Sequence, residues 1–170
     1  IVSDTDESPL PDEAPRDYVR RLAAEKARAA SARADASQVV VAADTAVVDG
    51  DAILGKPADP SDAMRMLRQL RGHIHQVFTG IAALRVHDGL VLTDLCVTDV
   101  PMRNYSDAEI ESYVETGDPL DKAGAYAIQH ASFQPVAEMQ GCYASVMGLP
   151  LCHVTRLLRQ MELTAGADVP

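Results

Sequence analysis

Apolar residues recur every three or four positions in four stretches of the chain, the spacing that places them on one face of an α-helix. The predicted helices cover residues 15–34, 60–71, 107–116 and 150–161. Asp59 is a suitable N-cap before Pro60, and Ser106 with Glu109 forms a capping box. Gly117 can end the third helix in a left-handed conformation.

Runs of β-branched and apolar residues between these helices predict strands. Residues 39–43 form a short apolar run that is typical of a buried strand and stops at Asp44-Thr45. The turn dipeptide Asp49-Gly50, followed by Ile53-Leu54, then predicts a β-hairpin.

Two longer β-rich segments, residues 76–86 and 90–102, follow and are joined by a turn at residues 87–89. A weaker strand is expected at 133–139. Strands and helices interleave, but hairpin-like neighbours argue against a purely parallel sheet. The pattern therefore predicts an α/β fold in which a mixed sheet carries flanking helices.

The composition is that of one soluble globular domain. The 170 residues are 47% hydrophobic and 24% charged, which suffices for a substantial core. We place the domain at residues 1–163 and a flexible tail at 164–170. A formal charge of −10 argues against nucleic acid or an anionic membrane as partner. Without a membrane-spanning stretch or signal region in the sequence, a cytoplasmic protein is expected.

Cysteine and histidine spacing indicates neither a disulfide framework nor a zinc site. Cys96, Cys142 and Cys152 are odd in number and lack paired spacing, which favours buried free thiols. His73 and His75 stand one residue apart, as zinc ligands can, but no matching pair lies near them in the sequence. A surface turn that leads into a strand fits these histidines better.

The dipeptide Asp44-Thr45 is the most informative polar feature of the chain. A carboxylate at the end of a buried strand lies where open α/β sheets place their ligands, and there Asp44 could hold Mg²⁺ or orient water. Taken alone, an Asp in this position is more typical of a loop or cap residue. The charged residues around it decide between the two interpretations.

Three further charged residues can converge on Asp44. Lys26 lies on the preceding helix and Lys56 in the loop after the hairpin, so both can bind phosphate oxygens. The pair Asp6-Glu7 can add a second carboxylate for a metal ion or for water activation, which phosphoanhydride cleavage requires. By themselves the lysines are more typical of solvated surface charges, and Asp6-Glu7 of an acidic loop.

The segment 118–129 has the composition of a substrate loop, because it is polar at its start and rich in small residues. It ends at Gln129, whose carboxamide can read a base through its paired donor and acceptor. Lys122, in the same segment, is a second candidate for substrate binding.

Several short sequence motifs occur in a fixed order along the chain. They are Ala43-Asp44-Thr45, Gly55-Lys56-Pro57, His75-Gln76-Val77-Phe78-Thr79-Gly80, the loop 121–129 and Gly148-Leu149-Pro150. Together they resemble the Maf family, once named for septum formation, and the match runs from about Asp6 to about Leu158. The resemblance implies that family's inosine-triphosphatase-like fold, with two lobes around a nucleotide cleft.

The resemblance also implies roles for the charged residues. Asp44 is the implied catalytic acidic residue that accepts a proton, while Glu7, Lys26 and Lys56 line the phosphate and metal region. Asp44 and Glu7 are the implied ligands of a divalent cation, Mg²⁺ or Mn²⁺. Members of the family are commonly homodimers.

The same resemblance implies a pyrimidine substrate. Thr45, directly after the catalytic Asp, is similar to the branch that cleaves dTTP and UTP, and Gln129 matches the other specificity position. The expected reaction is metal-dependent hydrolysis of dTTP or UTP, with modified pyrimidine nucleotides as an open extension, to the monophosphate and pyrophosphate. Two alternatives stay open: cleavage of 7-methyl-GTP or another nucleoside triphosphate, and non-catalytic nucleotide binding by a division regulator.

Departures from the family pattern concern the N-terminus and the base pocket. Family members begin with a strand and a Ser-x-Ser-Pro-Arg-Arg turn that binds phosphate. This strand, turn and helix, with a specificity arginine, are missing before Ile1, and a shortened form of a longer chain is the expected reason. Arg71-Gly72 and Gln129-His130 stand where Ser-Gly and Gln-Gly are usual, so substrate preference could differ.

Overall fold

The computed structural model describes residues 6–162, so the flexible tail predicted at 164–170 lies outside the described residues. Four strands form one sheet in the order β2-β1-β3-β4. They are β1 (Val39–Asp49), β2 (Ala52–Leu54), β3 (Ile74–Arg85) and β4 (Leu90–Pro101), and each neighbouring pair is antiparallel. The predicted α/β class, with helices flanking a sheet, is confirmed.

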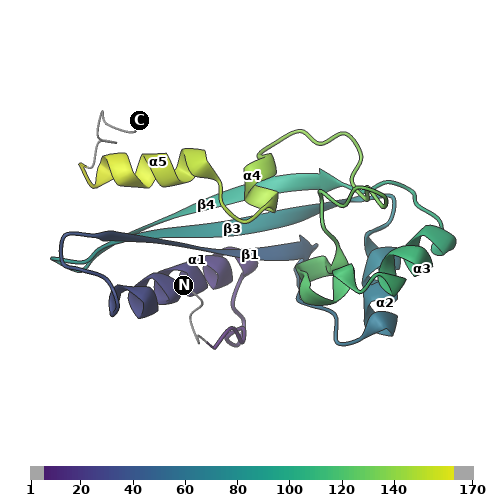
Figure 1. Ribbon diagram of the computed structural model, residues 1–170, viewed down its shortest axis with the longest axis horizontal. Helices are drawn as coiled ribbons and strands as arrows, with labels where there is room; N and C mark the ends of the chain where they lie inside the picture. The colour runs from purple at the N-terminus through teal and green to yellow at the C-terminus, as the bar shows by residue number, and fades with distance from the viewer. Residues whose placement is uncertain (1–5, 163–170) are drawn as a thin grey trace.

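Helices cover both faces of this sheet. α1 (Pro15–Ser31) packs along β1 and β3 on one face, whereas α4 (Tyr143–Val146) and α5 (Leu151–Gln160) lie against β3 and β4 on the other (Figure 1). A smaller group gathers at one end of the sheet (Figure 1). It consists of α2 (Pro60–Leu70), α3 (Asp107–Glu115) and two short 3₁₀ turns, η1 (Asp118–Asp121) and η2 (Ala123–Ala125).

The buried apolar side chains form separate clusters in the smaller group and between the sheet and its covering helices. The larger core joins α2, α3 and the adjoining end of the sheet, where Leu67, Leu70 and Ile110 are fully buried. Between α1 and the sheet, the buried helix positions include the small residues Ala23 and Ala27. Small side chains let a helix approach a sheet closely, which matters for the site described below.

The predicted helix signals are confirmed where they are local. The side chain of Asp59 accepts a hydrogen bond from the backbone N–H of Asp62 and so caps α2. Ser106 and Glu109 form both bonds of the capping box before α3. Gly117 has a φ of 77°, the left-handed conformation expected of a residue that ends a helix.

The prediction that a strand stops at Asp44 is wrong. β1 continues through Asp44 and Thr45, which pair with Gly80 and Thr79 of β3. Both polar residues are tolerated inside a strand because they border a pocket at its edge. The strand expected at 133–139 is likewise reduced to a single bridge between Met102 and Val136, and α4 was not predicted.

The histidines and cysteines depart in part from expectation. His73 is exposed and lies 3.1 Å from Asp49, but His75 is buried on β3, with Nε2 2.8 Å from the hydroxyl of Tyr126. The cysteines are free, yet of the three only Cys96 is buried. Within the described residues, no helix has the length and apolar character needed to cross a bilayer.

Candidate active site at the edge of β1

A pocket of about 390 Å³ lies beside β1, bordered by residues 122–129 and by residues 146–148 at the end of α4. This volume is within the range of small-molecule sites. β2 pairs only with the last three residues of β1, so the earlier part of β1 pairs with β3 alone in the described structure. Asp44 and Thr45, which line the pocket, belong to this part of β1. All the residues selected from the sequence line it: Glu7, Lys26, Asp44, Thr45, Lys56, Lys122 and Gln129.

Strand geometry divides the pocket into two sides. Successive side chains of a strand point to opposite faces of the sheet, so the side chains of Asp44 and Thr45 lie on different faces although both line the pocket. Asp44 lies on the α1 face, where it meets Lys26. Thr45 lies on the α4 face, where its hydroxyl meets that of Thr79. One pocket therefore receives a charged group from one face and a neutral hydroxyl from the other.

On the α1 face, one ammonium group joins two carboxylates. Lys26 Nζ lies 2.6 Å from Asp44 Oδ1 and 2.6 Å from Glu7 Oε1. Burial raises the pKa of the Asp44 carboxyl above its usual value; the hydrogen bond from Lys26 opposes that rise only in part, and the negative charge of Glu7 adds to it. Burial by itself would lower the pKa of Lys26, but its bonds to Asp44 and Glu7 outweigh that effect and raise it.

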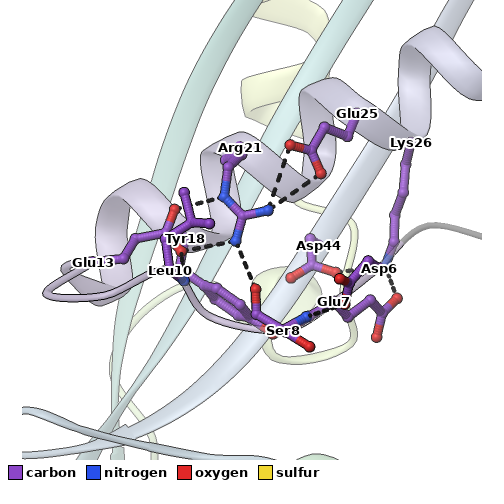
Figure 2. A network of polar contacts seen from close by, with 10 residues as sticks. All are labelled: Asp6, Glu7, Ser8, Leu10, Glu13, Tyr18, Arg21, Glu25, Lys26 and Asp44. Carbon is purple, nitrogen blue, oxygen red and sulfur yellow. Dashed lines mark hydrogen bonds and ion pairs between the residues drawn. The ribbon is translucent and has the colours of Figure 1, made fainter.

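Arg21 holds the segment that carries Glu7 against α1 (Figure 2). Its guanidinium donates to both carboxylate oxygens of Glu13, at 2.7 and 2.8 Å, and to the carbonyl of Ser8 at 3.1 Å. This hydrogen bonding also keeps the pKa of Glu13 below its usual value. The hydroxyl of Tyr18 donates to the carbonyl of Glu7 at 2.9 Å. Two side chains of α1 thus hold the backbone at Glu7 and at the residue after it.

Gly80 gives α1 the room to lie beside Asp44. It pairs directly with Asp44 across the sheet, and a Cβ at this position would overlap the backbone carbonyl of Val19. Glycine, the one residue type without a Cβ, therefore stands where the helix backbone lies against the strand. The approach of Lys26 to Asp44 depends on this contact, because Lys26 and Val19 belong to the same helix.

On the α4 face, three hydroxyl groups form a cluster. Thr45 Oγ1 lies 3.0 Å from Thr79 Oγ1, which donates to the carbonyl of Ser145 at 2.8 Å. Ser145 Oγ donates to Thr79 Oγ1 at 3.1 Å. Thr79 and Ser145 are fully buried, whereas Thr45 is partly exposed in the pocket. Sequence analysis had selected Thr45 from this cluster; Thr79 stood in a family string, but nothing in the sequence showed its contact with Ser145.

The remaining selected residues form the rim. Lys56 and Gln129 are exposed at the pocket. Lys122 reaches the pocket as well, but its ammonium is bound by Asp118 and Asp121, with Nζ 2.7 Å from Asp121 Oδ1. Lys122 therefore offers less free charge to a ligand than the sequence suggested.

The floor of the pocket includes Tyr126, which sequence analysis did not single out. Its hydroxyl lies 2.8 Å from Nε2 of His75. The two rings meet edge to face with centroids 5.4 Å apart. Burial lowers the pKa of His75 to about 4, so its ring is neutral at pH 7. Only the fold brings these two residues together, since they lie far apart in the sequence.

The two carboxylates fit a hard divalent cation. Mg²⁺ is commonly bound by one or two carboxylates together with substrate phosphates. Across the part of the chain that the structure describes, His, Cys, Asp and Glu side chains form no group of three that could hold a metal ion. A divalent cation at this site would therefore use Glu7, Asp44 and phosphate oxygens of the substrate.

Comparison with known proteins gives consistent matches along nearly the whole chain. A family model described as Maf-like protein matches residues 1–161. The dTTP/UTP pyrophosphatase of Anaeromyxobacter dehalogenans (strain 2CP-C) is 51% identical over 170 residues, which cover 99% of this chain and 83% of the relative. The protein of that name from Geobacter sulfurreducens is 49% identical over 161 residues, with coverages of 94% and 83%. That from Hahella chejuensis is 45% identical over 168 residues, with coverages of 98% and 83%.

Proposed function

The chain belongs to the family of Maf-like proteins, and from this premise we propose that it is a nucleoside triphosphate pyrophosphatase that hydrolyses dTTP and UTP. The family resemblance seen in the sequence strings is confirmed. One observation carries the proposal to this chain: Lys26 binds both Asp44 and Glu7 at a pocket that Lys56 also lines. The products are the nucleoside monophosphate and pyrophosphate.

The chemistry follows from the charges. Cleavage of a phosphoanhydride requires neutralised phosphate charge and a water molecule placed in line with the leaving group. Lys56 supplies positive charge at the pocket, and Lys26 offsets part of the negative charge of Asp44 and Glu7. Asp44 accepts a proton from the attacking water, whose oxygen bonds to the α-phosphorus as the bond from that phosphorus to the bridging oxygen breaks. Burial of Asp44 makes its carboxylate a stronger base, and this supports the role.

Glu7 and Asp44 are the proposed ligands of Mg²⁺ or Mn²⁺. When bound with the substrate, the cation would neutralise phosphate charge. Lys26 then keeps both carboxylates in position by its two short contacts. Because Lys26 holds them together in the described structure, the carboxylates are arranged before a ligand arrives.

The base is proposed to lie on the α4 side of the pocket. Thr45 and Gln129 line the pocket and offer a hydroxyl and a carboxamide to a pyrimidine. Lys122, held by two carboxylates, shapes the adjoining loop and completes the substrate-binding set. Modified pyrimidine nucleotides belong to the same proposed substrate class.

The proposed setting is a homodimer in the cytoplasm that acts on free nucleotides. The formal charge of −10 supports small nucleotides as substrates, because a nucleic-acid backbone favours a basic surface. Lys56, exposed at the pocket, provides local positive charge on an otherwise acidic chain.

Pyrophosphate release tests the proposal, measured with Mg²⁺ or Mn²⁺ on dTTP, UTP, CTP, GTP and 7-methyl-GTP. We expect turnover of dTTP and UTP, and its loss in Asp44→Asn. Asp51→Asn, at an exposed hairpin position, is the matched control and should keep full turnover. Preference for 7-methyl-GTP would overturn the pyrimidine assignment, and nucleotide binding without turnover would favour a regulator.

A further inference from the structure

The hydroxyl cluster behind Thr45 leaves little freedom in where its hydrogens lie. Thr79 sits at its centre, fully buried, with three oxygen atoms within hydrogen-bond distance. These are Thr45 Oγ1, Ser145 Oγ and the carbonyl oxygen of Ser145. A threonine hydroxyl has one hydrogen and two lone pairs, so three neighbours use all of them.

The direction of each bond follows from counting hydrogens. A carbonyl oxygen can only accept, and the carbonyl of Ser145 lies 2.8 Å from Thr79 Oγ1, so Thr79 donates its single hydrogen there. Thr79 can then only accept from the other two hydroxyls. Thr45, 3.0 Å away, must therefore donate its own hydrogen to Thr79.

This leaves Thr45 with only lone pairs for a ligand. Thr45 lines the pocket and is partly exposed, and Gly148 beside it carries no side chain. A Cβ at Gly148 would stand 3.6 Å from Thr45 Oγ1. A substrate group that meets Thr45 from the pocket must consequently bring a hydrogen of its own.

We propose that Thr79 is a positioning residue that fixes the hydrogen of Thr45 away from the pocket, so that Thr45 selects bases with a donor at N3. This rests on the proposed function. Uracil and thymine carry an N–H at N3, whereas cytosine has a lone pair there that would face the lone pairs of Thr45. The named activity of the relatives, on dTTP and UTP, concerns the two bases that share this N–H.

The test compares kcat/KM for UTP and CTP in variants of Thr79. Thr79→Val keeps the shape but removes the hydroxyl, which frees the hydrogen of Thr45 to turn towards the pocket. We expect the preference for UTP over CTP to fall about tenfold or more. The preference depends on CTP leaving the Thr45 hydroxyl without a hydrogen-bond partner, and the freed hydrogen of Thr45 would remove that penalty. Thr79→Ser restores the hydroxyl and should restore the preference.

Ser145→Ala is the matched control. It removes the Oγ that donates to Thr79 but keeps the carbonyl that receives the hydrogen of Thr79, so the UTP preference should persist. A purely structural role for Thr79 would lower both rates and leave their ratio unchanged, which would overturn the proposal. So would a loss of preference in Ser145→Ala equal to that in Thr79→Val.

A second measurement needs no variant and stands even if Thr79→Val does not fold. 3-Methyl-UTP lacks the N3 hydrogen and should be cleaved by the unaltered protein no better than CTP. Cleavage as fast as that of UTP would overturn the proposal. If no pyrimidine triphosphate is cleaved at all, the proposed function fails, and the ratio of dissociation constants for UMP and CMP across the same variants decides the role of Thr79.

Discussion

Replacing Gly80 with alanine would test whether the contact between α1 and β3 sets the geometry of the site. The added methyl group would overlap the carbonyl of Val19 and stand 2.8 Å from the backbone nitrogen of Arg20. Both are backbone atoms of a helix, so neither can rotate away. Either α1 moves outward along its length or β3 bends.

The magnitude follows from what each response costs. Overpacking of a well-packed site typically costs about 1–3 kcal/mol, so we expect Gly80→Ala to lower the free energy of unfolding by that amount. An outward movement of α1 also carries Lys26 away from Asp44, which it now approaches to 2.6 Å. A displacement of about 1 Å in a catalytic group can lower the rate about 100-fold. We therefore expect kcat to fall by roughly one to two orders of magnitude.

Urea unfolding and pyrophosphate release are the two assays. Gly55→Ala is the control for stability, because no atom lies within 4 Å of a Cβ at Gly55. We expect that control to unfold at the same urea concentration as the unaltered protein. If Gly80→Ala were as stable as Gly55→Ala and kept full turnover, the close contact would not govern the site, and the reasoning would be refuted.

Four further predictions concern single groups and conditions. Asp44→Asn should lower kcat by about 10² to 10⁴, the range for loss of a general base, and a loss below tenfold would assign Asp44 a supporting role. Arg21→Gln frees the segment before α1 and should lower kcat/KM through misplacement of Glu7; unchanged kinetics would show that Glu7 needs no such support. The pKa of His75 is lowered from its usual value near 6.5 to about 4, so the unfolded chain takes up this proton at a higher pH than the folded protein does. The free energy of unfolding should therefore be highest above pH 6.5 and should fall as the pH is lowered towards 4. Urea titrations should show that decline, and His75→Phe should flatten it. A chelator should abolish turnover and added Mg²⁺ restore it, while the unfolding midpoint stays unchanged because Lys26 already holds both carboxylates.

Local signals in the sequence predicted the helices well. The caps at Asp59 and Ser106 are formed by residues within a few positions of one another, so they can be found without knowing the fold. The charged set around Asp44 was also found, because acidic and basic residues flank a short apolar run. Their roles in catalysis remain predictions for the experiments above.

Contacts between distant segments could not be predicted. The polar pair Asp44-Thr45 resembled the end of a strand, although pairing with β3 carries β1 onward to Asp49. His75 looked exposed because its partner Tyr126 lies 51 residues away and belongs to a loop without regular pattern. Thr79 gave no separate signal, since a threonine in an apolar strand is ordinary until its neighbour across the sheet is known.

With the roles proposed for Asp44 and Thr45, their opposite orientations would make bond cleavage and base choice separately adjustable. The carboxylate contacts Lys26 of α1, near the segment that Arg21 anchors, while the hydroxyl contacts Thr79, which Ser145 of α4 adjoins. A substitution of Arg21 or of Ser145 therefore leaves the contacts on the other face of the sheet in place. Redesign of the α4 side could retune which nucleotide enters the pocket while the hydrolytic groups, built from the other face of the same strand, keep their arrangement.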